Sequence, residues 1–247
     1  MNIILFEANE LVNDCVVLND QRAKHIVKVL QSRTGDRLRV GMIDGNIGEA
    51  RVVSVKRKFP FVVELSVHLT GQPEPPPAID LLLALPRPIM LKRILSQVTA
   101  LGIHTIHLVN ANRVEKSFWD AGLLEKEAYR PHLIHGLEQA VDTCLPKIRM
   151  HRHFRPFVEE YLPDLATQYS SLLLAHPFAE QKLSQCLPET AEKILYAVGP
   201  EGGWVDFEVE KLLATGMCAF SMGSRILKVD TAVVAIHSRI SQEMERK

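Results

Sequence analysis

The stretch Gly71–Pro77 (GQPEPPP), with four prolines in seven residues, is the feature that most constrains how this chain folds. Proline has no backbone N–H and holds φ near one value, so neither a helix nor a central strand continues through such a stretch. We expect residues 71–78 to form a stiff, extended linker. The 247 residues are therefore predicted to fold as two domains, over residues 1–70 and 79–247, each large enough to bury a core of its own.

The segment before the linker has the pattern of a small β-rich domain. Residues 36–43, 47–55 and 61–69 are rich in β-forming side chains, and Asp44–Asn46 (DGN) supplies the residues of a hairpin turn. Residues 20–31 place their apolar side chains on one helical face, and Asp20 is suited to cap that helix. This segment is predicted to be a compact β-barrel-like module with one helix.

After the linker the pattern changes to short apolar runs that alternate with amphipathic helical stretches. The runs cover residues 79–85, 105–110, 171–176, 193–199 and 218–223. Buried parallel strands have this composition, and the alternation with helices indicates an α/β domain. Residues 230–244 are predicted to form the last helix.

Charge is balanced over the whole chain but not along it. There are 29 Lys and Arg against 29 Asp and Glu, so the net charge predicts no partner. Residues 21–58 nevertheless carry ten Lys or Arg against three acidic residues. A local basic patch can bind a polyanion, because phosphate contacts depend on local charge. The alternative is that the patch is only a solvated surface.

The four cysteines, Cys15, Cys144, Cys186 and Cys218, are far apart in the sequence. None forms a CxxC pair, and no His/Cys group has the spacing of zinc ligands, so no metal site is expected. They are predicted to be buried free thiols. No apolar run reaches membrane-spanning length, and the acidic N-terminus is unlike a secretory signal. We therefore expect a cytoplasmic protein without a membrane partner.

Three loops that follow predicted strands carry the residues typical of a ligand site. Gly199–Gly203 (GPEGG) lies between a strand and a helix, where glycines let backbone groups approach a ligand, although it has neither the GxGxxG nor the P-loop spacing. Met222–Ala232 (MGSRILKVDTA) and Leu174–Phe178 (LAHPF) also follow strands. Open α/β sheets bind ligands at this edge. Taken one at a time, the three segments could equally be a tight turn, a helix start and an incidental histidine.

The combination of GPEGG with the later MGSRILKVDTA resembles the bacterial 16S ribosomal RNA uridine-N3 methyltransferases of the SPOUT superfamily. The resemblance covers nearly the whole chain. His25–Leu30 followed by Thr34–Asp36 is similar to the PUA-like RNA-binding domain of that family, and Leu101–Ile103 and Leu137–Ala140 match its central pattern.

This resemblance implies a catalytic domain with a trefoil knot, an exception to the rule that chains are unknotted. It also implies a homodimer and S-adenosylmethionine held by the three loops. The cofactor-binding residues would be Leu174, His176, Gly199, Pro200, Glu201, Gly202, Gly203, Met222, Gly223, Ile226 and Leu227. The residues that bind small-subunit ribosomal RNA would be Arg22, Lys24, His25, Lys28, Arg33, Arg87 and Lys228.

Methylation at uridine N3 requires the loss of a weakly acidic proton, which suggests three catalytic candidates. In the resembling family the position of Arg225 faces the target base, where a guanidinium would stabilise charge on the uracil oxygens. Asp230 or Glu138 would remove the proton. The residues do not decide between these two carboxylates.

Several positions depart from the family pattern. Asp230 replaces a usual Glu and Lys228 a usual Arg, while Gln97 and Ala100 replace a Lys and a Glu. These changes keep three other functions open: methylation of another RNA position, ribose 2′-O methylation, and RNA binding without catalysis. Val205 replaces a helix-capping Ser, so Asp206 is expected to cap.

The resemblance places part of the dimer interface on the C-terminal helix. Its residues Ala232, Ile236 and Ile240 recur at four-residue steps and so share one face. The alternative is that this face packs on the sheet of its own chain.

Overall fold

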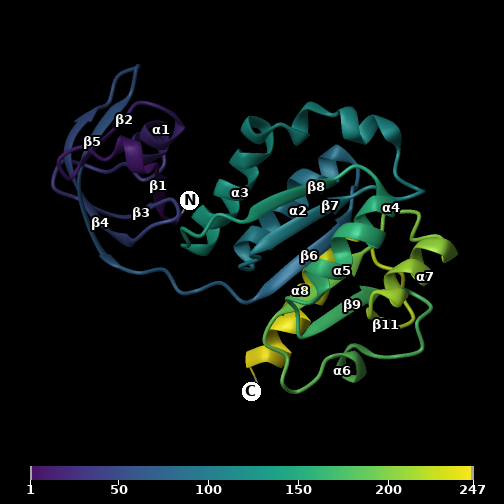
Figure 1. The fold of residues 1–247 in the computed structure, drawn as a ribbon. Coiled ribbons are helices and arrows are strands. Elements are labelled where there is room, and N and C mark those ends of the chain that lie inside the picture. Colours follow the sequence, from purple (N-terminus) through teal and green to yellow (C-terminus); the bar gives the residue numbers. More distant parts are fainter. Residues whose placement is uncertain (1, 246–247) are drawn as a thin grey trace. The chain divides into compact units, whose positions relative to one another are not determined.

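The computed structural model describes residues 2–245, and the chain divides into two compact units (Figure 1). Unit 1 comprises Met1–Pro75 and Ile134–Leu145, and unit 2 comprises Pro76–Leu133 and Pro146–Lys247. The segment Ile134–Leu145 was expected in the domain behind the linker, but it groups with the front unit. Within the described residues, no helix is both long and apolar enough to cross a membrane.

Unit 1 is built on a five-stranded sheet with the order β1-β3-β4-β5-β2. β1 pairs in parallel with β3, and the remaining pairs are antiparallel. Its elements are β1 (Ile4–Phe6), the short 3-10 helix η1 (Ala8–Glu10), β2 (Cys15–Leu18), α1 (Gln21–Lys28), β3 (Arg37–Met42), β4 (Ile47–Lys56) and β5 (Val62–Gly71).

The predicted local signals of the front segment are confirmed. The carboxylate of Asp20 accepts a hydrogen bond from the backbone N–H of Arg22 at 2.9 Å and so caps α1. The Asp44–Asn46 turn joins β3 to β4, and Asp44 adopts a positive φ of 56°. The apolar face of α1, with Ala23 and Ile26 fully buried, closes the core of the sheet.

The C-terminal half of α3 (Lys126–Ala140) completes a second, smaller core in unit 1. Leu137 is fully buried and packs with Ile3 and Leu5 of the first strand region. The backbone N–H of Asn2 donates to the carbonyl of Glu138 at 2.9 Å. Non-local packing of this kind leaves no local sequence signal, so the position of the linker does not indicate that this segment packs with the first strand region.

Unit 2 contains alternating strands and helices. They are β6 (Ile79–Ala84), α2 (Pro88–Ala100), β7 (Thr105–Val109), η2 (Lys116–Asp120), η3 (Gly122–Leu124), the first half of α3, β8 (Lys147–His151), α4 (Phe154–Pro156), the π-helical turn η4 (Phe157–Tyr161), α5 (Leu162–Ala166), β9 (Ser171–Ala175), α6 (Leu183–Cys186), β10 (Ile194–Val198), α7 (Asp206–Ala214), β11 (Cys218–Phe220) and α8 (Val229–Glu245).

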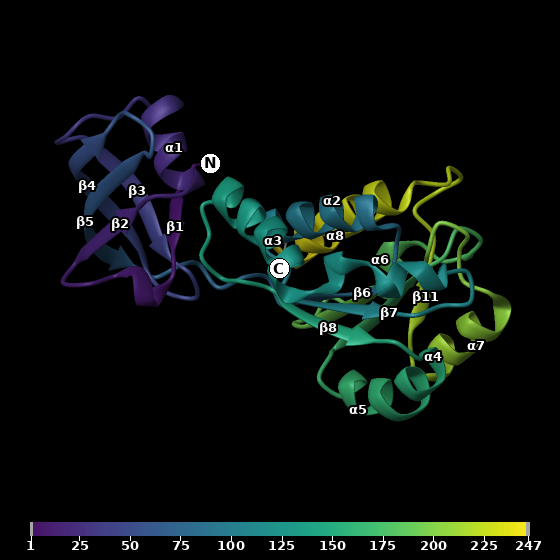
Figure 2. The same ribbon diagram turned by 90° about the horizontal axis from the view of Figure 1, so that it is seen from above.

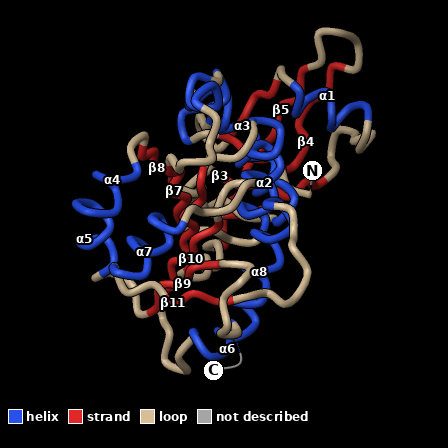
Figure 3. Tube along the Cα trace, turned by 90° about the vertical axis from the view of Figure 1, so that its right-hand side faces the viewer, coloured by secondary structure: helices blue, strands red, loops and turns tan. Residues whose placement is uncertain are grey.

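The six strands of unit 2 form one parallel sheet with the order β11-β9-β10-β6-β7-β8. Helices cover both faces, with α2 and α8 on one face and α4, α5 and α7 on the other (Figures 2 and 3). β6 lies in the middle of the sheet and is buried along its whole length. This agrees with the apolar run that predicted it.

β8 is the one strand of unit 2 that the apolar-run pattern did not predict. It lies at the edge of the sheet, and its sequence KIRMH leaves Lys147, Arg149 and Met150 exposed. An edge strand has solvent beside it, so it lacks the continuous apolar composition of a central strand.

The inward face of α8 is occupied within the chain itself. Ile236 and Ile240 are 1% and 0% exposed, and α8 packs against α2 and β10. The expectation that Ile236 and Ile240 form part of a dimer interface is therefore wrong. Buried apolar residues at helical spacing are equally typical of packing on the chain's own sheet, and here that alternative holds.

Candidate cofactor site

Three loops of unit 2 follow strands that are direct neighbours in the sheet. β9 lies between β10 and β11, and all three run parallel. Leu174 of β9 is in register with Ala197 of β10 and with Ala219 of β11. Parallel strands in register end at the same edge, so the loops that begin at His176, Gly199 and Ser221 lie together, as the sequence predicted.

Backbone hydrogen bonds connect the loop after β9 to the loop after β11. The N–H of His176 donates to the carbonyl of Phe220, and the N–H of Ser221 donates to the carbonyl of Gln181, both at 2.9 Å. The Ser221 hydroxyl donates to the carbonyl of Pro177 at 3.3 Å. The two segments therefore form one joined wall of the site.

A disulfide between Cys186 and Cys218 joins the same two segments. Cys186 ends α6, Cys218 begins β11, and their Cα atoms are 5.6 Å apart. The prediction of four free thiols is therefore wrong for this pair, while Cys15 and Cys144 are free and partly exposed. The two partners are 32 residues apart, so only the packing of α6 beside β11 brings them together.

The glycine loop after β10 turns sharply and leads into α7. Gly203 has a φ of 74°, which L-residues with side chains rarely adopt, and its N–H donates to the carbonyl of Pro200 at 2.8 Å. A Cβ atom on Gly199 would lie 3.0 Å from the indole of Trp204. The glycines of this loop are thus required by backbone conformation and by close packing.

The indole N–H of Trp204 is a hydrogen-bond donor beside this loop without a partner. Trp204 is 5% exposed, and its Nε1 has no hydrogen-bond partner among the described residues. A buried donor left unpaired costs about 1–3 kcal/mol of desolvation. This atom is therefore placed to donate to a bound ligand or an ordered water.

Arg113, in the loop after β7, also contacts the glycine loop. Its guanidinium donates to the carbonyl of Gly202, and a Cβ on Gly202 would lie 2.9 Å from the Cδ atom of Arg113. This arginine lies outside the sequence motifs that predicted the site. Its position just after the 105–110 strand, at the same edge of a parallel sheet, was the available signal.

The start of α7 is capped by Glu208. Its carboxylate accepts from the N–H of Val205 at 3.0 Å and from the N–H of Asn112 at 2.6 Å. Glu208 is 2% exposed. The expectation that Asp206 caps this helix is therefore wrong, because Val205 occupies the capping position and a carboxylate one turn later reaches back to it.

The loop between β11 and α8 combines an unusual backbone with exposed apolar side chains. Gly223 has a φ of 113°, and no heavy atom lies within 4 Å of where its Cβ would be. The Ile226 side chain is 77% exposed and that of Leu227 is 36% exposed. Exposed apolar groups beside glycine loops are typical of a surface that a ligand or a partner covers.

Comparison with known proteins identifies both parts of the chain. Residues 73–241 match the RNA methyltransferase domain family, and residues 18–65 match the RNA methyltransferase PUA domain family. This chain belongs to the RNA methyltransferase family. The predicted fold class, a SPOUT-type α/β methyltransferase domain behind a PUA-like β domain, is confirmed.

Individual relatives cover nearly the full length. The ribosomal RNA small subunit methyltransferase E of Treponema pallidum is 35% identical over 238 residues, which are 95% of this chain and 88% of that protein. The Neisseria gonorrhoeae methyltransferase of the same name, solved bound to S-adenosyl methionine, superposes with a TM-score of 0.75 at 21% identity and 97% coverage of both chains. A methyltransferase structure from Legionella pneumophila with bound SAM superposes with a TM-score of 0.79 at 19% identity, and the match covers 98% of this chain and 97% of that chain.

Of the predicted catalytic and RNA-binding residues around the Gly223 loop, two are exposed to solvent and one is bound by neighbouring groups. Arg225 and Lys228 are exposed in the Gly223 loop. Asp230, at the start of α8, accepts from the N–H of Thr231 at 3.0 Å and lies 3.9 Å from a guanidinium nitrogen of Arg93. Its carboxylate therefore stabilises the helix start, and its role as a base stays a prediction.

The predicted residues Arg87 and Glu138 lie outside the Gly223 loop. Arg87 is exposed after β6, and its backbone N–H donates to the side chain of Glu201 at 3.3 Å, which joins a fourth loop to the cluster. Glu138 belongs to unit 1, outside the loop cluster of unit 2, and burial raises the pKa of its carboxyl. Its role as a base stays a prediction.

In the PUA domain, one of the predicted RNA-binding cations is already neutralised. The guanidinium of Arg22 donates to Glu10 and to Asp20 at 2.6 Å each and to the carbonyl of Leu5 at 2.8 Å. These ion pairs raise the pKa of Arg22. Arg22 therefore stabilises the fold, and its assignment to RNA is not supported by its contacts.

The remaining predicted cations of the PUA domain differ in exposure. Lys24, Lys28 and Arg33 are exposed, whereas His25 is half-buried. Burial lowers the pKa of His25, which disfavours the charged form of its ring. The basic patch is therefore narrower than its sequence composition indicated.

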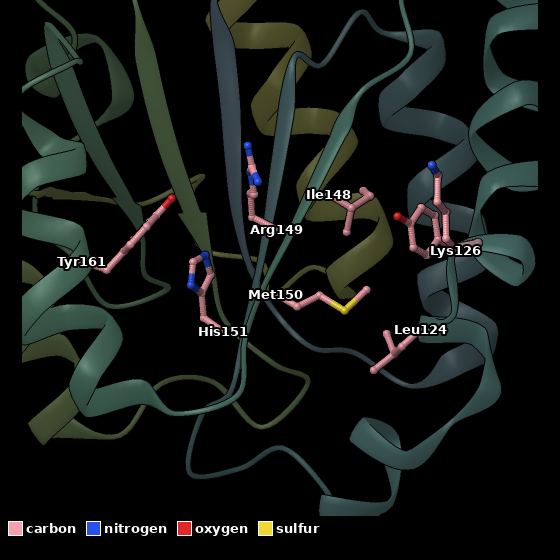
Figure 4. Close-up of a pocket in the computed structure, with 8 residues that line it drawn as sticks. Leu124, Lys126, Ile148, Arg149, Met150, His151 and Tyr161 are labelled. Carbon is pink, nitrogen blue, oxygen red and sulfur yellow. The ribbon is translucent and has the colours of Figure 1, made fainter.

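A separate pocket lies at the opposite edge of the sheet, beside β8 (Figure 4). His151 and Tyr161 lie to one side of the strand, and Lys126 and Leu124 lie to the other. His151 contacts His107 at 3.2 Å, and burial lowers the pKa of each to about 4, so both rings are neutral at pH 7. β8 and β11 are the two opposite edges of the sheet, so this pocket is not part of the loop cluster.

No metal site accompanies the loops. In residues 2–245, three His, Cys, Asp or Glu side chains are nowhere grouped in a way that would hold a metal ion.

Removing the Cys186–Cys218 disulfide is expected to destabilise the methyltransferase domain. The double variant Cys186→Ser, Cys218→Ser should lower the free energy of unfolding by about 2–4 kcal/mol, because the link restricts the unfolded chain. Urea denaturation measures this change. Dithiothreitol should destabilise the wild type by a similar amount and leave the double variant unchanged. Finding four titratable thiols in protein purified without reductant would contradict the disulfide.

Proposed function

We propose that this chain transfers the methyl group of S-adenosylmethionine to N3 of a uridine in small-subunit ribosomal RNA, uridine 1498 of 16S rRNA. The observation that carries this proposal is the cluster of three loops, two of them bearing glycine, at one edge of the sheet, in a chain 35% identical over nearly its full length to a ribosomal RNA small subunit methyltransferase. The substrate is an RNA of the ribosome, which agrees with a cytoplasmic location.

The residues present fit this cofactor. Gly203 and Gly223 expose backbone where a side chain would block approach, and the buried N–H of Trp204 lacks a partner within the described part of the chain. Adenosine offers ring nitrogens and hydroxyls that pair with such donors. The predicted contact residues between Leu174 and Leu227 would hold the cofactor mainly through their backbone. When bound, it supplies the methyl group on a sulfonium.

The chemistry that remains for the protein is to position the uridine and to manage its N3 proton. The exposed guanidinium of Arg225 presents two parallel N–H groups, which suit the uracil carbonyl oxygens and stabilise the anion left when N3 loses its proton. Lys228, three residues later, adds a second cation for the RNA. Asp230 is the nearer of the two carboxylate candidates in sequence, but Arg93 and the α8 amide already engage it. Proton removal through a water beside Asp230 is therefore the route we propose.

The cofactor assignment predicts that Gly223→Ala weakens S-adenosylmethionine binding about tenfold or more. An L-residue held in a left-handed conformation costs roughly 1–2 kcal/mol, so the loop would leave its present shape. The new methyl group meets no atom within 4 Å, so the fold should persist. Isothermal titration calorimetry measures the affinity. Gly122→Ala is the matched control, because it adds the same methyl group to open space without a positive φ.

The catalytic assignment predicts that Arg225→Ala lowers the single-turnover methylation rate on the order of a hundredfold, the effect of one lost donor to a developing anion. The rate of Arg225→Lys should lie between those of the wild type and Arg225→Ala, since lysine keeps the charge without the paired N–H groups. Mass spectrometry of rRNA fragments reads the modified position. If Arg225→Ala regains the full rate at saturating RNA, the residue only binds RNA.

Methylation at a ribose or another base would replace the uridine-N3 proposal, and failure to bind the cofactor would indicate a non-catalytic RNA-binding protein.

We also propose that the protein is a homodimer, as the resemblance implies. The buried face of α8 is not the contact surface, whereas the exposed pair Ile226 and Leu227 beside the glycine loops is apolar surface that a second copy would cover. Multi-angle light scattering at micromolar concentration should give twice the monomer mass of 27.8 kDa. The variant Ile226→Asp should shift this equilibrium toward monomer, and a wild-type monomer would contradict the proposal.

A further inference from the structure

The PUA domain contains a basic pocket that joins two of the predicted RNA-binding cations, Lys28 and Arg33, to Arg57, which the resemblance does not assign. It lies between the end of α1 and the end of β4, with a volume of about 690 Å³, which is within the usual range of about 300–1,000 Å³ for ligand sites. Lys28, Arg33 and Arg57 line it together with the neutral polar side chains of Gln31 and Thr34. None of the lining residues is acidic, so the pocket is suited to an anion.

These three cations are not neutralised within the protein. No ion pair in the described part of the chain includes Lys28, Arg33 or Arg57, in contrast to Arg22 in the same domain. The guanidinium of Arg57 donates to the buried carbonyl of Ser32 at 2.7 Å, which holds it at the pocket and leaves other N–H groups free. Three uncompensated charges in one hollow attract phosphate more strongly than scattered surface lysines do.

Aromatic and apolar side chains stand next to this pocket. The ammonium of Lys28 lies 5.3 Å from the ring centroid of Phe61, and the ring of Phe59 packs edge-on against Phe61 at 6.2 Å. Phe59 is 86% exposed, and Val29 is 64% exposed. A phenyl ring held in water beside a cationic pocket is suited to stack on a nucleobase, since every base has a π face.

We propose that this pocket binds one unpaired nucleotide of the RNA substrate, with its phosphate among Lys28, Arg33 and Arg57 and its base stacked on Phe59. The proposal rests on the proposed function, which supplies the RNA, but it adds that the PUA domain selects single-stranded RNA. A base inside a duplex is stacked on its neighbours and does not present a face to Phe59. The phosphates of a duplex would contact the cations alone.

Binding of the full-length protein to fluorescein-labelled RNA tests this inference. The probes are a short uridine-rich strand and the same strand in a perfect duplex, measured by fluorescence anisotropy. Phe59→Ala should weaken single-strand binding about tenfold, the effect of one lost stacked base, and leave duplex binding unchanged. Arg33→Ala should weaken both and reduce the slope of log affinity against log salt by about one. Arg39→Ala, an exposed arginine of β3 outside the pocket, is the matched control and should have a smaller effect.

The inference would be overturned by three results: no effect of Phe59→Ala on the single strand, an equal loss for the duplex, or a loss for Arg39→Ala as large as for Arg33→Ala. Displacement of the RNA by an acidic peptide at lower concentration would indicate a protein partner instead. Methylation of ribosomal RNA by the wild type is measured separately. Active enzyme with an unaffected Phe59→Ala variant rejects the pocket alone, whereas pocket-dependent RNA binding without methylation rejects only the proposed function.

Discussion

Parallel hydrogen bonding between β9 and its two neighbours, β10 and β11, is the constraint on which the cofactor site depends. Because the three strands run in one direction and in register, the segments that follow them must leave the sheet at one edge. The N–H of His176 therefore reaches the carbonyl of Phe220, more than forty positions later in the sequence, and the N–H of Ser221 reaches the carbonyl of Gln181. The helices on both faces shield the sheet from water, so its hydrogen bonds do not depend on the conformation of the loops at its edge.

The loop cluster carries local conformations that have no role in holding the sheet together. Gly203 and Gly223 adopt positive φ values, and the buried N–H of Trp204 has no partner in the described residues. The unpaired N–H of Trp204 raises the free energy of the folded chain, whereas the positive φ values of Gly203 and Gly223 cost little because glycine has no side chain. A buried donor is satisfied when a ligand or a water accepts from it, which supports the cofactor site that we propose. The Cys186–Cys218 disulfide restricts two of these segments, so part of the site is formed before any ligand arrives.

Neighbouring charges decide what each arginine of the PUA domain can do. Arg22 lies between Glu10 and Asp20, and its side chain is 19% exposed. Its ion pairs with these two carboxylates stabilise the folded domain. Arg33 and Arg57 have no carboxylate partner among residues 2–245, and they face one pocket. The same residue type is structural in one place and available to RNA in the other, although both belong to one basic stretch of the sequence.

The sequence by itself determined the features that depend on local chemistry. The buried strands of unit 2, the cap of α1 by Asp20 and the three loops at the strand ends follow from backbone restrictions and from the spacing of apolar residues. The family resemblance was equally visible, because it rests on the motifs of two of these loops. The edge strand β8 was missed because solvent beside it removes the apolar signal.

Only the tertiary structure decided which long-range partners each residue has. The transfer of Ile134–Leu145 to unit 1, the ion pairs of Arg22, the engagement of Asp230 by Arg93 and the cap of α7 by Glu208 all involve groups brought together by packing. The same is true of the disulfide and of the burial of Ile236 and Ile240. Local patterns specify what a residue can do, but solvent exposure and the nearest charge, which depend on chain segments far away in the sequence, decide what it does.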